Sequence, residues 1–361
     1  MNSLNNCPVV RSNSPTLPLQ NNTMKATPIE INWHSQLPIF ASESFLKSVG
    51  DEYGWLGGIE DTGELRCILP YTVIRKLNFR MVRFRVETIP LGSDLAVSDE
   101  KLFLNSAVDY FRSIGADIII PATTNTIFRT FPDGADAAPY GSFIIDLRPP
   151  EEVLWRNIDR VMRQNINSAK KNGVSIRSGL EHLDAAYLLV LDTFKRSGLP
   201  FMSKESFSRF VSGLGENTLI MTADHQGIAQ SYVVFAFSDY CAYAIYAGNL
   251  ANQHQGANKL LYWEAIRLFK QMGIQRYDFV GARIDPEKGS KQQKLNSFKK
   301  RFGATLKQGY MWKYSLHPFK YLLYSAAARL RSGGDIVDAE RHKLQNCSLV
   351  REEPPTFNGT V

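Results

Sequence analysis

The sequence has few of the residues that hold small secreted domains or metal centres together. Its four cysteines are scattered without a C-x-x-C pair, and its six histidines show no H-x-x-x-H or similar spacing. A chain of 361 residues buries enough apolar surface to fold without disulfide staples. We therefore expect reduced thiols, and the pattern gives no positive signal for a metal site.

Long hydrophobic runs are also missing. No stretch of about 18 uncharged apolar residues is present to cross a bilayer, and the N-terminus lacks the basic and apolar regions of a secretory signal. Residues 231–247 come closest, but Asp239 interrupts them, so we expect two buried strands there. Cytoplasmic localisation is the default expectation. The G-x-S-x-G elbow, the Walker loop and the Rossmann glycine fingerprint are all absent.

What the sequence does contain is the composition of a globular protein of two domains. Hydrophobic residues make up 44% of the chain and charged residues 21%. The polar ends, residues 1–28 and 341–361, carry too little apolar surface to offset chain entropy and are expected to be disordered. We divide the remainder into a first domain (29–148), a second domain (149–320) and a C-terminal helix with a tail (321–361).

The net charge is +7, from 42 lysines and arginines against 35 aspartates and glutamates. Such an excess favours anionic partners such as phosphates, RNA or a lipid surface, and peripheral association with a membrane is one expectation. A modest excess is also common in proteins that bind none of these. We expect no sequence-specific DNA binding.

Short strand-like and helix-like segments alternate along both halves, which predicts an α+β fold with mixed sheets flanked by helices. One continuous helix is expected from 151 to 171, after Pro149 and Pro150, and another from 255 to 272. Further expected helices cover 99–114, 183–196, 203–214 and 295–302, with a short one within 33–50. Expected strands are 53–59, 65–74, 117–121, 143–147, 174–177, 218–223, 230–237, 240–247, 276–280 and 310–315.

One lysine is set apart by its position on the predicted helix 295–302. At about 100° per residue, Leu295, Phe298 and Phe302 form an apolar stripe, and Lys299 falls beside it while Lys300 points away. A lysine on the packed side of a helix either extends along its methylenes to solvent or reaches a polar pocket with an anionic partner. Both interpretations stay open from the helical spacing alone.

Four motifs in order across residues 142–315 resemble the FemAB-type acyltransferases of the GNAT superfamily, which add amino acids to peptidoglycan precursors. They are the basic helix ending A-K-K-N-G-V at Val174, the segment T-F-K-R-S-G-L-P from Thr193, the helix and strand ending D-F-V-G at Gly281, and L-N-S-F-K-K-R-F-G from Leu295. The resemblance implies tandem GNAT domains and an acyltransferase with no cofactor beyond a co-substrate, either aminoacyl-tRNA or acyl-CoA.

Candidate roles in the second half come partly from the resemblance and partly from position in the sequence. The resemblance implies that Lys299 contacts the acyl donor and stabilises charge at the reacting centre, with Phe298 beside it, although a core phenylalanine is first a packing residue. Asp278, at the end of a strand, is a candidate base for the attacking amine, or else a cap for the next turn. Lys294 precedes Lys299 and is expected to help attract an anionic donor.

The donor and acceptor sides have further candidates. Gly256 and Asn258 open a helix after a strand, where unpaired N–H groups attract phosphate; a single glycine here weakens a coenzyme A site, and any strand-to-helix turn can contain one. For the acceptor we select Arg160 and Arg163 on the basic helix, whose charges also fit a solvated face, and Tyr246 at the expected cleft.

These observations lead to an expected function and two alternatives. The leading hypothesis is transfer of an aminoacyl or acyl group to an amine of a cell-envelope precursor, a nucleotide- or lipid-linked muropeptide. The first alternative is an acyl-CoA-dependent N-acetyltransferase of exopolysaccharide biosynthesis, because residues 169–218 leave no room for a long helical arm. The second is a basic binding module without catalysis.

Overall fold

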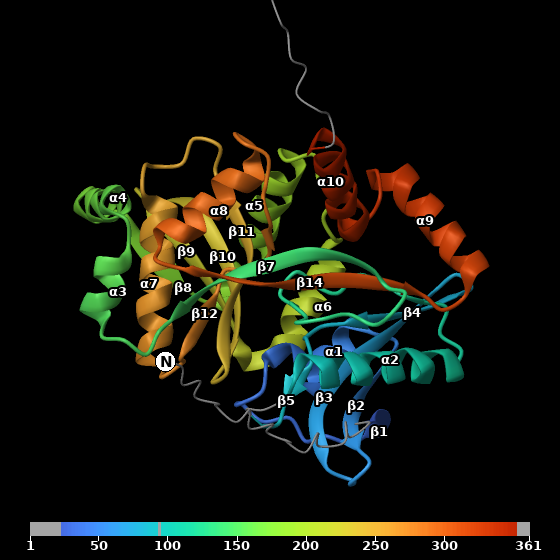
Figure 1. The fold of residues 1–361 in the computed structure, drawn as a ribbon. Coiled ribbons are helices and arrows are strands. Elements are labelled where there is room, and N and C mark those ends of the chain that lie inside the picture. The colour runs from blue at the N-terminus through green and yellow to red at the C-terminus, as the bar shows by residue number, and fades with distance from the viewer. Residues whose placement is uncertain (1–22, 93–94, 352–361) are drawn as a thin grey trace, which may run out of the picture.

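A long mixed β-sheet runs through the molecule in the computed structural model, which describes residues 23–92 and 95–351 (Figure 1). The hydrogen-bonded strand order is β1-β2-β3-β4-β6-β14-β7-β12-β11-β10-β9-β8, with β5 added to β3 and β13 added to β7. Helices pack against this sheet, so the expected α+β class is observed.

In the N-terminal part of the sheet, β1 to β4 are antiparallel neighbours, β4 pairs in parallel with β6, and α2 covers one face. Strands β2 and β3 form the expected hairpin, and the turn between them contains Gly63 at a φ of +84°. Apolar residues of the strands pack against Phe103 and Phe111 of α2. The elements are β1 (Met24–Ile29), η1 (Ile39–Ala41), α1 (Glu43–Val49), β2 (Glu52–Glu60), β3 (Leu65–Lys76), β4 (Phe79–Phe84), β5 (Ile89–Pro90), α2 (Val97–Ser113) and β6 (Ile118–Ile119).

The C-terminal part of the sheet has helices on both faces. Along β10 (Ile228–Ser238), Val233 and Phe235 face the core beneath α7, whereas Tyr232 and Val234 face the core beneath α5 and α6, as the two-residue period of a strand requires. The other elements are α3 (Glu151–Asn157), α4 (Arg160–Lys171), β8 (Ser175–Ser178), η2 (Leu180–His182), α5 (Leu183–Lys195), α6 (Lys204–Leu214), η3 (Gly215–Asn217), β9 (Thr218–His225), β11 (Cys241–Asn249), α7 (Ala257–Gln271), β12 (Arg276–Asp278), β13 (Ala282–Arg283) and α8 (Lys291–Arg301).

Two long strands join the parts. β7 (Asp136–Asp146) belongs to the first half of the sequence but lies between β14 and β12, and β14 (Thr305–Ser315) pairs with β7 and, at its end, with β6. Both cross the middle of the molecule in Figure 1. The sheet is therefore continuous across residue 148, and the division into 29–148 and 149–320 stays a prediction about sequence units.

The predicted continuous helix from 151 to 171 is wrong, because it is two helices. α3 ends before Ile158, and α4 begins after Asp159, whose carboxylate accepts hydrogen bonds from the amides of Val161 (3.0 Å) and Met162 (3.2 Å). An aspartate that satisfies the free amides of a first turn is a strong helix start. The Asp159 side chain therefore begins a second helix at a point where hydrophobic spacing alone indicates one continuous helix.

The expected disorder of both ends is corrected in part. Residues 24–28 form most of β1, which pairs in antiparallel register with β2. At the other end, α9 (Pro318–Ser332) is followed by α10 (Ile336–Arg351), so 341–351 are helical. Tertiary pairing supplies the stability that local composition lacks. Residues 1–22 and 352–361 lie outside the described residues.

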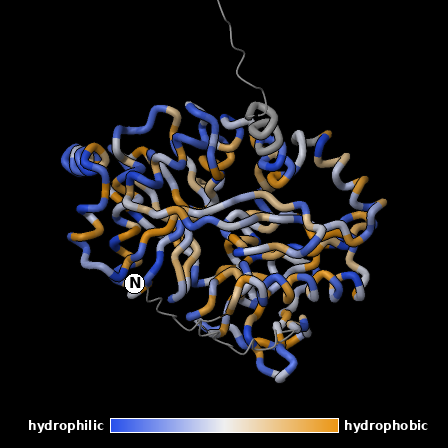
Figure 2. The backbone as a smooth tube through the Cα atoms, in the orientation of Figure 1, coloured by the Kyte–Doolittle hydropathy of each residue, from blue (hydrophilic) through white to orange (hydrophobic). Residues whose placement is uncertain are grey.

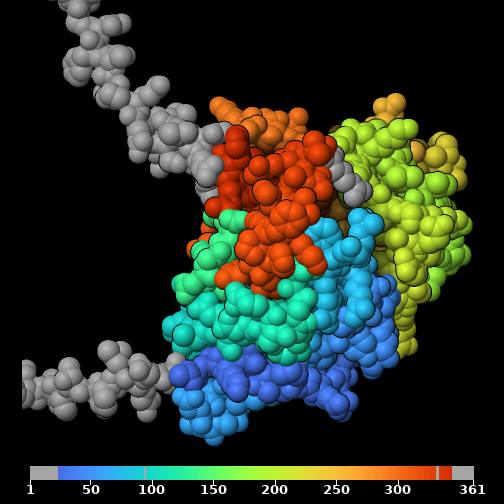
Figure 3. Space-filling model, turned by 90° about the vertical axis from the view of Figure 1, so that its right-hand side faces the viewer, coloured from blue at the N-terminus to red at the C-terminus, as the bar shows by residue number. Residues whose placement is uncertain are grey.

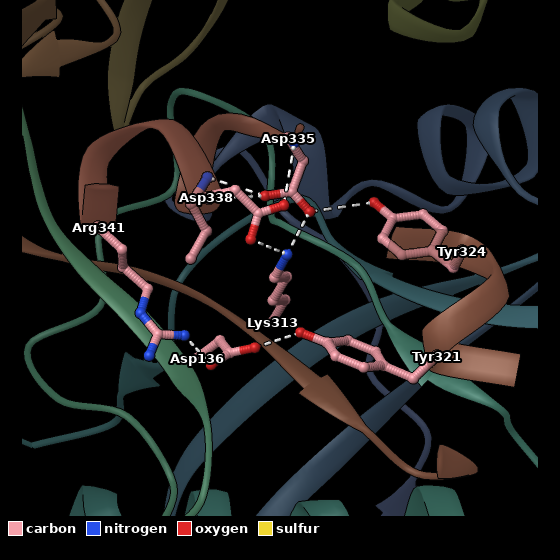
Figure 4. Close-up of polar contacts among 8 residues, drawn as sticks. Asp136, Lys313, Tyr321, Tyr324, Asp335, Asp338 and Arg341 are labelled. Atoms are coloured by element: carbon pink, nitrogen blue, oxygen red, sulfur yellow. Dashed lines mark hydrogen bonds and ion pairs between the residues drawn. The ribbon is translucent and has the colours of Figure 1, made fainter. Parts of the chain in front are cut away.

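The C-terminal helices are fastened to the sheet by a buried cation. Lys313 of β14 is 1% exposed, and its ammonium donates to Asp335 (2.9 Å) and Asp338 (2.6 Å) at the start of α10 (Figure 4). Asp136 of β7 accepts from Tyr321 of α9 and pairs with Arg341 of α10. The network ties both helices to the two crossing strands.

We expect Lys313→Met to lower the free energy of unfolding by about 3 kcal/mol, because two carboxylates are left without their shared cation. Urea denaturation measures the change. Lys343→Met is the matched control, since Lys343 makes a more exposed ion pair with Glu340 (3.1 Å), which Arg283 also contacts; its effect should stay within about 0.5 kcal/mol. Equal losses in the two variants would contradict the anchoring role of Lys313.

Candidate functional site

Lys299 lies near the end of α8 and is held by backbone carbonyls. Its ammonium donates to the carbonyl oxygen of Val280 (2.6 Å) and to that of Gly281, while Lys300 one residue further is exposed. A lysine ammonium has three N–H donors, so one remains for a ligand. Of the two interpretations left open, the structure shows the ammonium on backbone carbonyls rather than extended to solvent, and the role of Lys299 in catalysis stays a prediction. The stripe beside it is shorter than expected, because Leu295 is 47% exposed.

The carbonyls that hold Lys299 come from a strained turn. Val280 has a φ of +43° and Gly281 a φ of +62°, two successive residues in the left-handed region directly after β12. A β-branched residue there is a conformational outlier, which costs about 1–3 kcal/mol and persists only where the surroundings enforce it. The strained turn directs both carbonyls at one ammonium, which a relaxed strand end would not do.

Asp278 holds this turn through a hydrogen bond to its backbone. It is 5% exposed, and its Oδ1 accepts hydrogen bonds from the amide of Val280 (2.7 Å) and from the hydroxyl of Ser142 on β7. Among the described residues no group donates to its Oδ2. The aspartate therefore does cap the turn, as one sequence interpretation has it, and one oxygen stays available for a proton.

Burial brings the titrations of these two groups close to neutrality. Desolvation raises the pKa of Asp278 to about 6, against the hydrogen bonds of Ser142 and Val280 and the charge of Lys299, which lower it. Desolvation lowers the pKa of Lys299 to about 8, against the charge of Asp278. At pH 7 the majority forms are a carboxylate and an ammonium, each close to its titration midpoint.

A cavity of about 780 Å³ opens between the N-terminal and C-terminal parts of the molecule. Its second-half wall is aromatic, with Phe201, Phe210 and Tyr246 among the lining residues, and Thr124 belongs to the opposite wall. The turn that holds Lys299 lies behind that wall, because a Cβ built on Gly281 would come within 3.3 Å of the Thr124 Cβ. Thr124 thus separates the cavity from the turn that holds Lys299, and Lys299 itself is not among the lining residues.

Tyr246 is the acceptor candidate that the structure brings to the cavity. β11 carries a bulge there, since Tyr246 pairs with Val234 and Ala244 with Phe235, which leaves Ile245 extra; Ile245 and Tyr246 both line the cavity. Bulges redirect side chains and are frequent beside active sites. Burial raises the pKa of Tyr246 to about 12, so its hydroxyl is neutral at physiological pH.

Two cavity residues, Arg83 and Arg85, were missed by the sequence reasoning. Arg83 lies in β4 and Arg85 directly follows the end of that strand, and both line the cavity, whereas Val82 and Phe84 pack in the core beneath α2. The Nε of Arg83 donates to the carbonyl of Pro121 (3.0 Å), and Arg85 donates to the hydroxyl of Thr72 and the carbonyl of Val49. The available signal was arginine at alternate positions of an apolar run, R-M-V-R-F-R.

No carboxylate among the described residues forms an ion pair with either arginine. Asp51 is the acidic side chain that lines the cavity, and it is exposed and accepts instead from the amide of Arg75. Burial, together with the charge of Arg83, lowers the pKa of Arg85 to about 9. The cavity therefore holds two desolvated cations without a counter-charge, which is the electrostatic setting of an anion site.

The donor-side candidates are arranged around packing contacts. Gly256 stands before α7 at a φ of +87°, and a Cβ on it would meet the Asn165 carbonyl of α4 at 2.3 Å, so helix packing alone requires a glycine there. Asn258, in the first turn of α7, is half-buried, and Lys294 is exposed. Phe298 packs edge-on against the ring of Tyr262. Their roles in donor binding stay predictions.

Arg160 and Arg163 are not brought to the cavity. Both are on α4, at the left edge of the molecule in Figure 1, and no residue of α4 is among those that line the cavity. Arg160 is exposed, and Arg163 donates to the carbonyls of Trp155 and Arg156 at the end of α3. The geometry gives acceptor binding by these two residues no support, and it gives Arg163 a structural role in the break between the two helices.

The described residues also bear on metal binding and on insertion into membranes. Within 23–92 and 95–351, the side chains include no group of three or more histidines, cysteines, aspartates or glutamates placed to hold a metal ion. In the same ranges, no helix is both long and apolar enough to cross a bilayer.

No protein-family model matches the sequence, and the search of curated proteins finds no significant match. Solved structures do match. The crystal structure of FemX aligns with 80% of this chain and 93% of its own, with a TM-score of 0.58 and 15% identity.

Two weaker matches are the C-terminal domain of a putative lysylphosphatidylglycerol synthetase from Agrobacterium fabrum (TM-score 0.49, 13% identity, 84% of this chain and 97% of that one) and a tandem GNAT protein from the clavulanic acid biosynthesis pathway (TM-score 0.48, 11% identity, 82% and 99%). The match to FemX shows the fold alone: this chain has the fold of FemX.

Proposed function

We propose that this chain is an N-acyltransferase in which an amine of the acceptor attacks the carbonyl carbon of an activated acyl donor directly. The nitrogen lone pair forms the new C–N bond while the carbonyl π electrons move to oxygen. The resulting oxyanion then reforms the carbonyl and expels the donor's alkoxide or thiolate, which takes up the proton that the nitrogen has lost to the base and leaves as an alcohol or thiol. The single observation that carries the proposal is an ammonium fixed on a strained turn, near a buried carboxylate, in a turn that packs against Thr124 of the cavity wall.

Lys299 supports this chemistry through its third N–H. A cation already fixed by two carbonyls loses no orientation energy when the oxyanion forms, and in a desolvated site its field is far stronger than in water. The strained carbonyls of Val280 and Gly281 oppose rotation of the ammonium away from the reacting atoms. The lysine thus stabilises the intermediate without itself exchanging a proton.

Asp278 supplies the proton acceptor in this proposal. The attacking nitrogen becomes positively charged when the C–N bond forms and must lose a proton to yield an amide. With a pKa raised to about 6, Asp278 is ionised at neutral pH yet more basic than an exposed aspartate. Because the residue is buried, the transfer proceeds from the cavity to its free Oδ2 through one ordered water.

The acceptor is proposed to occupy the cavity with an acidic group on Arg83 and Arg85. Guanidinium groups bind phosphate and carboxylate in two-pronged fashion, and these two have terminal N–H groups without partners among the described residues. A nucleotide- or lipid-linked muropeptide carries both such acidic groups and an amine. With the motif resemblance, this supports aminoacyl-tRNA as donor and a cell-envelope precursor as acceptor.

A second candidate keeps the chemistry but changes the donor to acyl-CoA, with an amino sugar of an exopolysaccharide as acceptor. One observation favours it: between α4 and β9 the chain forms only β8, η2, α5, α6 and η3, without the long helical arm of aminoacyl-tRNA-dependent enzymes. Against it, the Asn165 carbonyl packs directly on Gly256 at the start of α7, where a pyrophosphate would bind.

Isothermal titration with two donors separates these alternatives. Saturable binding of charged but not uncharged tRNA supports the leading proposal, and tight binding of acetyl-CoA supports the second candidate. Weak binding of every polyanion, with a steep loss of affinity in salt and no product, would favour a basic binding module and overturn the proposal of an enzyme.

The pH dependence of kcat/KM should be bell-shaped, with limbs near the pKa values of about 6 for Asp278 and about 8 for Lys299. The rate rises as pH increases through 6 because the carboxylate forms, and falls through 8 because the ammonium is lost. Asp278→Asn should remove the acid limb. Ionisation of the acceptor amine affects the wild-type and variant rates equally, so the ratio of the two rates does not contain it. If this ratio were independent of pH from 5 to 7, Asp278 would be excluded as the base.

A further inference from the structure

Helix α9 presents its apolar side to solvent. The exposed residues recur at helical spacing along one face, and the exposed fraction reaches 91% at Leu330 and 65% at Leu322. We call this face the α9 stripe, and its members are Phe319, Leu322, Leu323, Ala326, Ala327 and Leu330. A surface helix ordinarily turns such a stripe toward the core, so the arrangement here is reversed. Figure 2 shows these apolar positions at the edge of the molecule, and Figure 3 shows α9 forming part of its outer surface.

The reversed orientation is fixed by polar contacts on the opposite side of the helix. The hydroxyl of Tyr321 donates to Asp136 on β7, and that of Tyr324 donates to Asp335 (3.4 Å) at the start of α10. Figure 4 shows both rings directed inward, toward the crossing strands. A rotation that buried the stripe would break these hydrogen bonds, so the fold itself holds the stripe in its exposed position.

A second apolar side chain adjoins the helix. Leu77 is 90% exposed at the turn between β3 and β4, and its φ of +53° places a bulky residue in the left-handed region. The turn contacts the start of α9, because the ammonium of Lys320 donates to the carbonyl of Asn78 (2.7 Å). A strained turn that holds a leucine in solvent extends the apolar surface beyond the helix itself.

The charge around this surface is positive. Neither α9 nor the segment 75–81 contains an aspartate or glutamate. Their described basic residues are Arg75, Lys76, Arg80, Lys320 and Arg329. Glu52 pairs with Arg75 and Arg80, and Asp117 pairs with Lys320. Among the described residues Lys76 and Arg329 have no acidic partner. Beside the stripe, Arg75, Arg80, Lys320 and Asp117 line a recess of about 310 Å³.

We propose that the α9 stripe and Leu77 dock on the surface of an anionic phospholipid bilayer, with the axis of α9 in the membrane plane. Leucine and phenylalanine enter the boundary between headgroups and acyl chains, and the flanking cations attract the anionic headgroups. A second copy of the chain fits less well, because a two-fold contact would bring two net-positive surfaces together. Acidic lipid satisfies both the apolar and the charged part of the surface.

Docking in this way carries the cavity to the membrane. Ile336, at the start of α10, lines the cavity, and α10 directly follows α9 in the chain. The C-terminal helices thus lie between the anion site and the docked surface. This placement does not depend on the proposed acyl transfer, because binding to vesicles requires no turnover.

Flotation of the full chain with vesicles tests the proposal. Wild-type protein is expected to float with equimolar phosphatidylcholine and phosphatidylglycerol but not with phosphatidylcholine alone. The double variant Phe319→Ser with Leu322→Ser should bind the mixed vesicles at least about tenfold more weakly. The matched control is Leu180→Ser with Leu188→Ser, which removes two leucines of 54% and 64% exposure elsewhere and should bind as wild type does.

A charge pair and an oligomer measurement complete the test. Lys76→Glu with Arg329→Glu should weaken binding by at least about tenfold, whereas Lys25→Glu with Lys171→Glu, the same change of charge at other exposed positions, should have a smaller effect. Failure of the wild type to float, or equal binding by the stripe variant and its control, overturns the proposal. So does a dimer in light scattering that the stripe variant abolishes, since the occupant is then a second copy.

Discussion

Replacing Lys299 by methionine is expected to lower the rate of acyl transfer by at least about tenfold, or about 1.4 kcal/mol of barrier, and by up to about a thousandfold if its third N–H reaches the oxyanion. Methionine matches the length of the lysine stem and packs equally well beside Phe298. The loss belongs to the ammonium, which is the group that contacts Val280 and Gly281. Single-turnover product formation, with both substrates saturating, measures the chemical step.

Lys300→Met is the control for this variant. The two lysines are adjacent on α8, but the side chain of Lys300 is exposed. The substitution Lys300→Met removes the same charge from the same helix. If the rate depended only on the positive field around α8, the two variants would lose similar amounts. A full rate in Lys299→Met, with circular dichroism unchanged, would remove this lysine from the site.

Arg85→Met is expected to raise the KM for an acidic acceptor by about 10- to 100-fold, the cost of a lost charge-assisted hydrogen bond in a desolvated site. The melting temperature should not fall. Arg85 is buried without a carboxylate partner, and burial lowers its pKa to about 9, which means that folding disfavours its charged form. A residue that costs stability and binds ligand is the expected compromise of a functional site.

Arg209→Met provides the comparison for Arg85. Arg209 lines the same cavity and carries the same charge, but it is exposed at the rim on α6. Its replacement should change KM only slightly, because water already solvates the guanidinium and weakens its field. If Arg85→Met lowered stability and left KM unchanged, the arginine would be a structural residue that supports Val49 and Thr72.

Some residues of the site could be predicted from the sequence because their positions depend on a few neighbouring residues only. The position of Lys299 beside a packed stripe follows from helical geometry over a few residues, and Asp278 follows from its place at the end of a short buried strand. Their mutual arrangement does not follow. It depends on Val280 and Gly281 adopting left-handed conformations, which the sequence indicates only through one glycine.

The anion site was missed because its local signal, arginines within the apolar run R-M-V-R-F-R, does not show that two of them share a cavity. β4 was not among the expected strands, and Arg83 and Arg85 acquire a shared cavity only when the second half supplies Tyr246 on a bulged strand. Pairings of this kind join residues far apart in the chain. Arg160 and Arg163 also stand close together in a basic segment of the sequence, but they lie away from the cavity, because long-range pairing decides which segments meet.

The fold shows the same division between local and long-range information. Helices α5, α6 and α7 and the hairpin of β2 and β3 follow from periodicity, caps and turns that lie within single segments. The crossing of β7 and β14, which joins the two parts of the sheet, depends on pairing between Asp136 and Lys313 and their neighbours. The outward face of α9 depends on two tyrosines whose partners lie in other elements, so periodicity predicts the stripe but not its direction.

The bond formed in the product tests most directly the claim that an amine of the acceptor receives an acyl group directly from the donor. Purified protein is incubated with an extract of cell-envelope precursors and with either labelled acetyl-CoA or tRNA charged with labelled amino acids. The expected result is a labelled acceptor, formed with one donor only, that withstands neutral hydroxylamine as an amide does. Label that hydroxylamine removes, or no transfer from either donor, would contradict the claim.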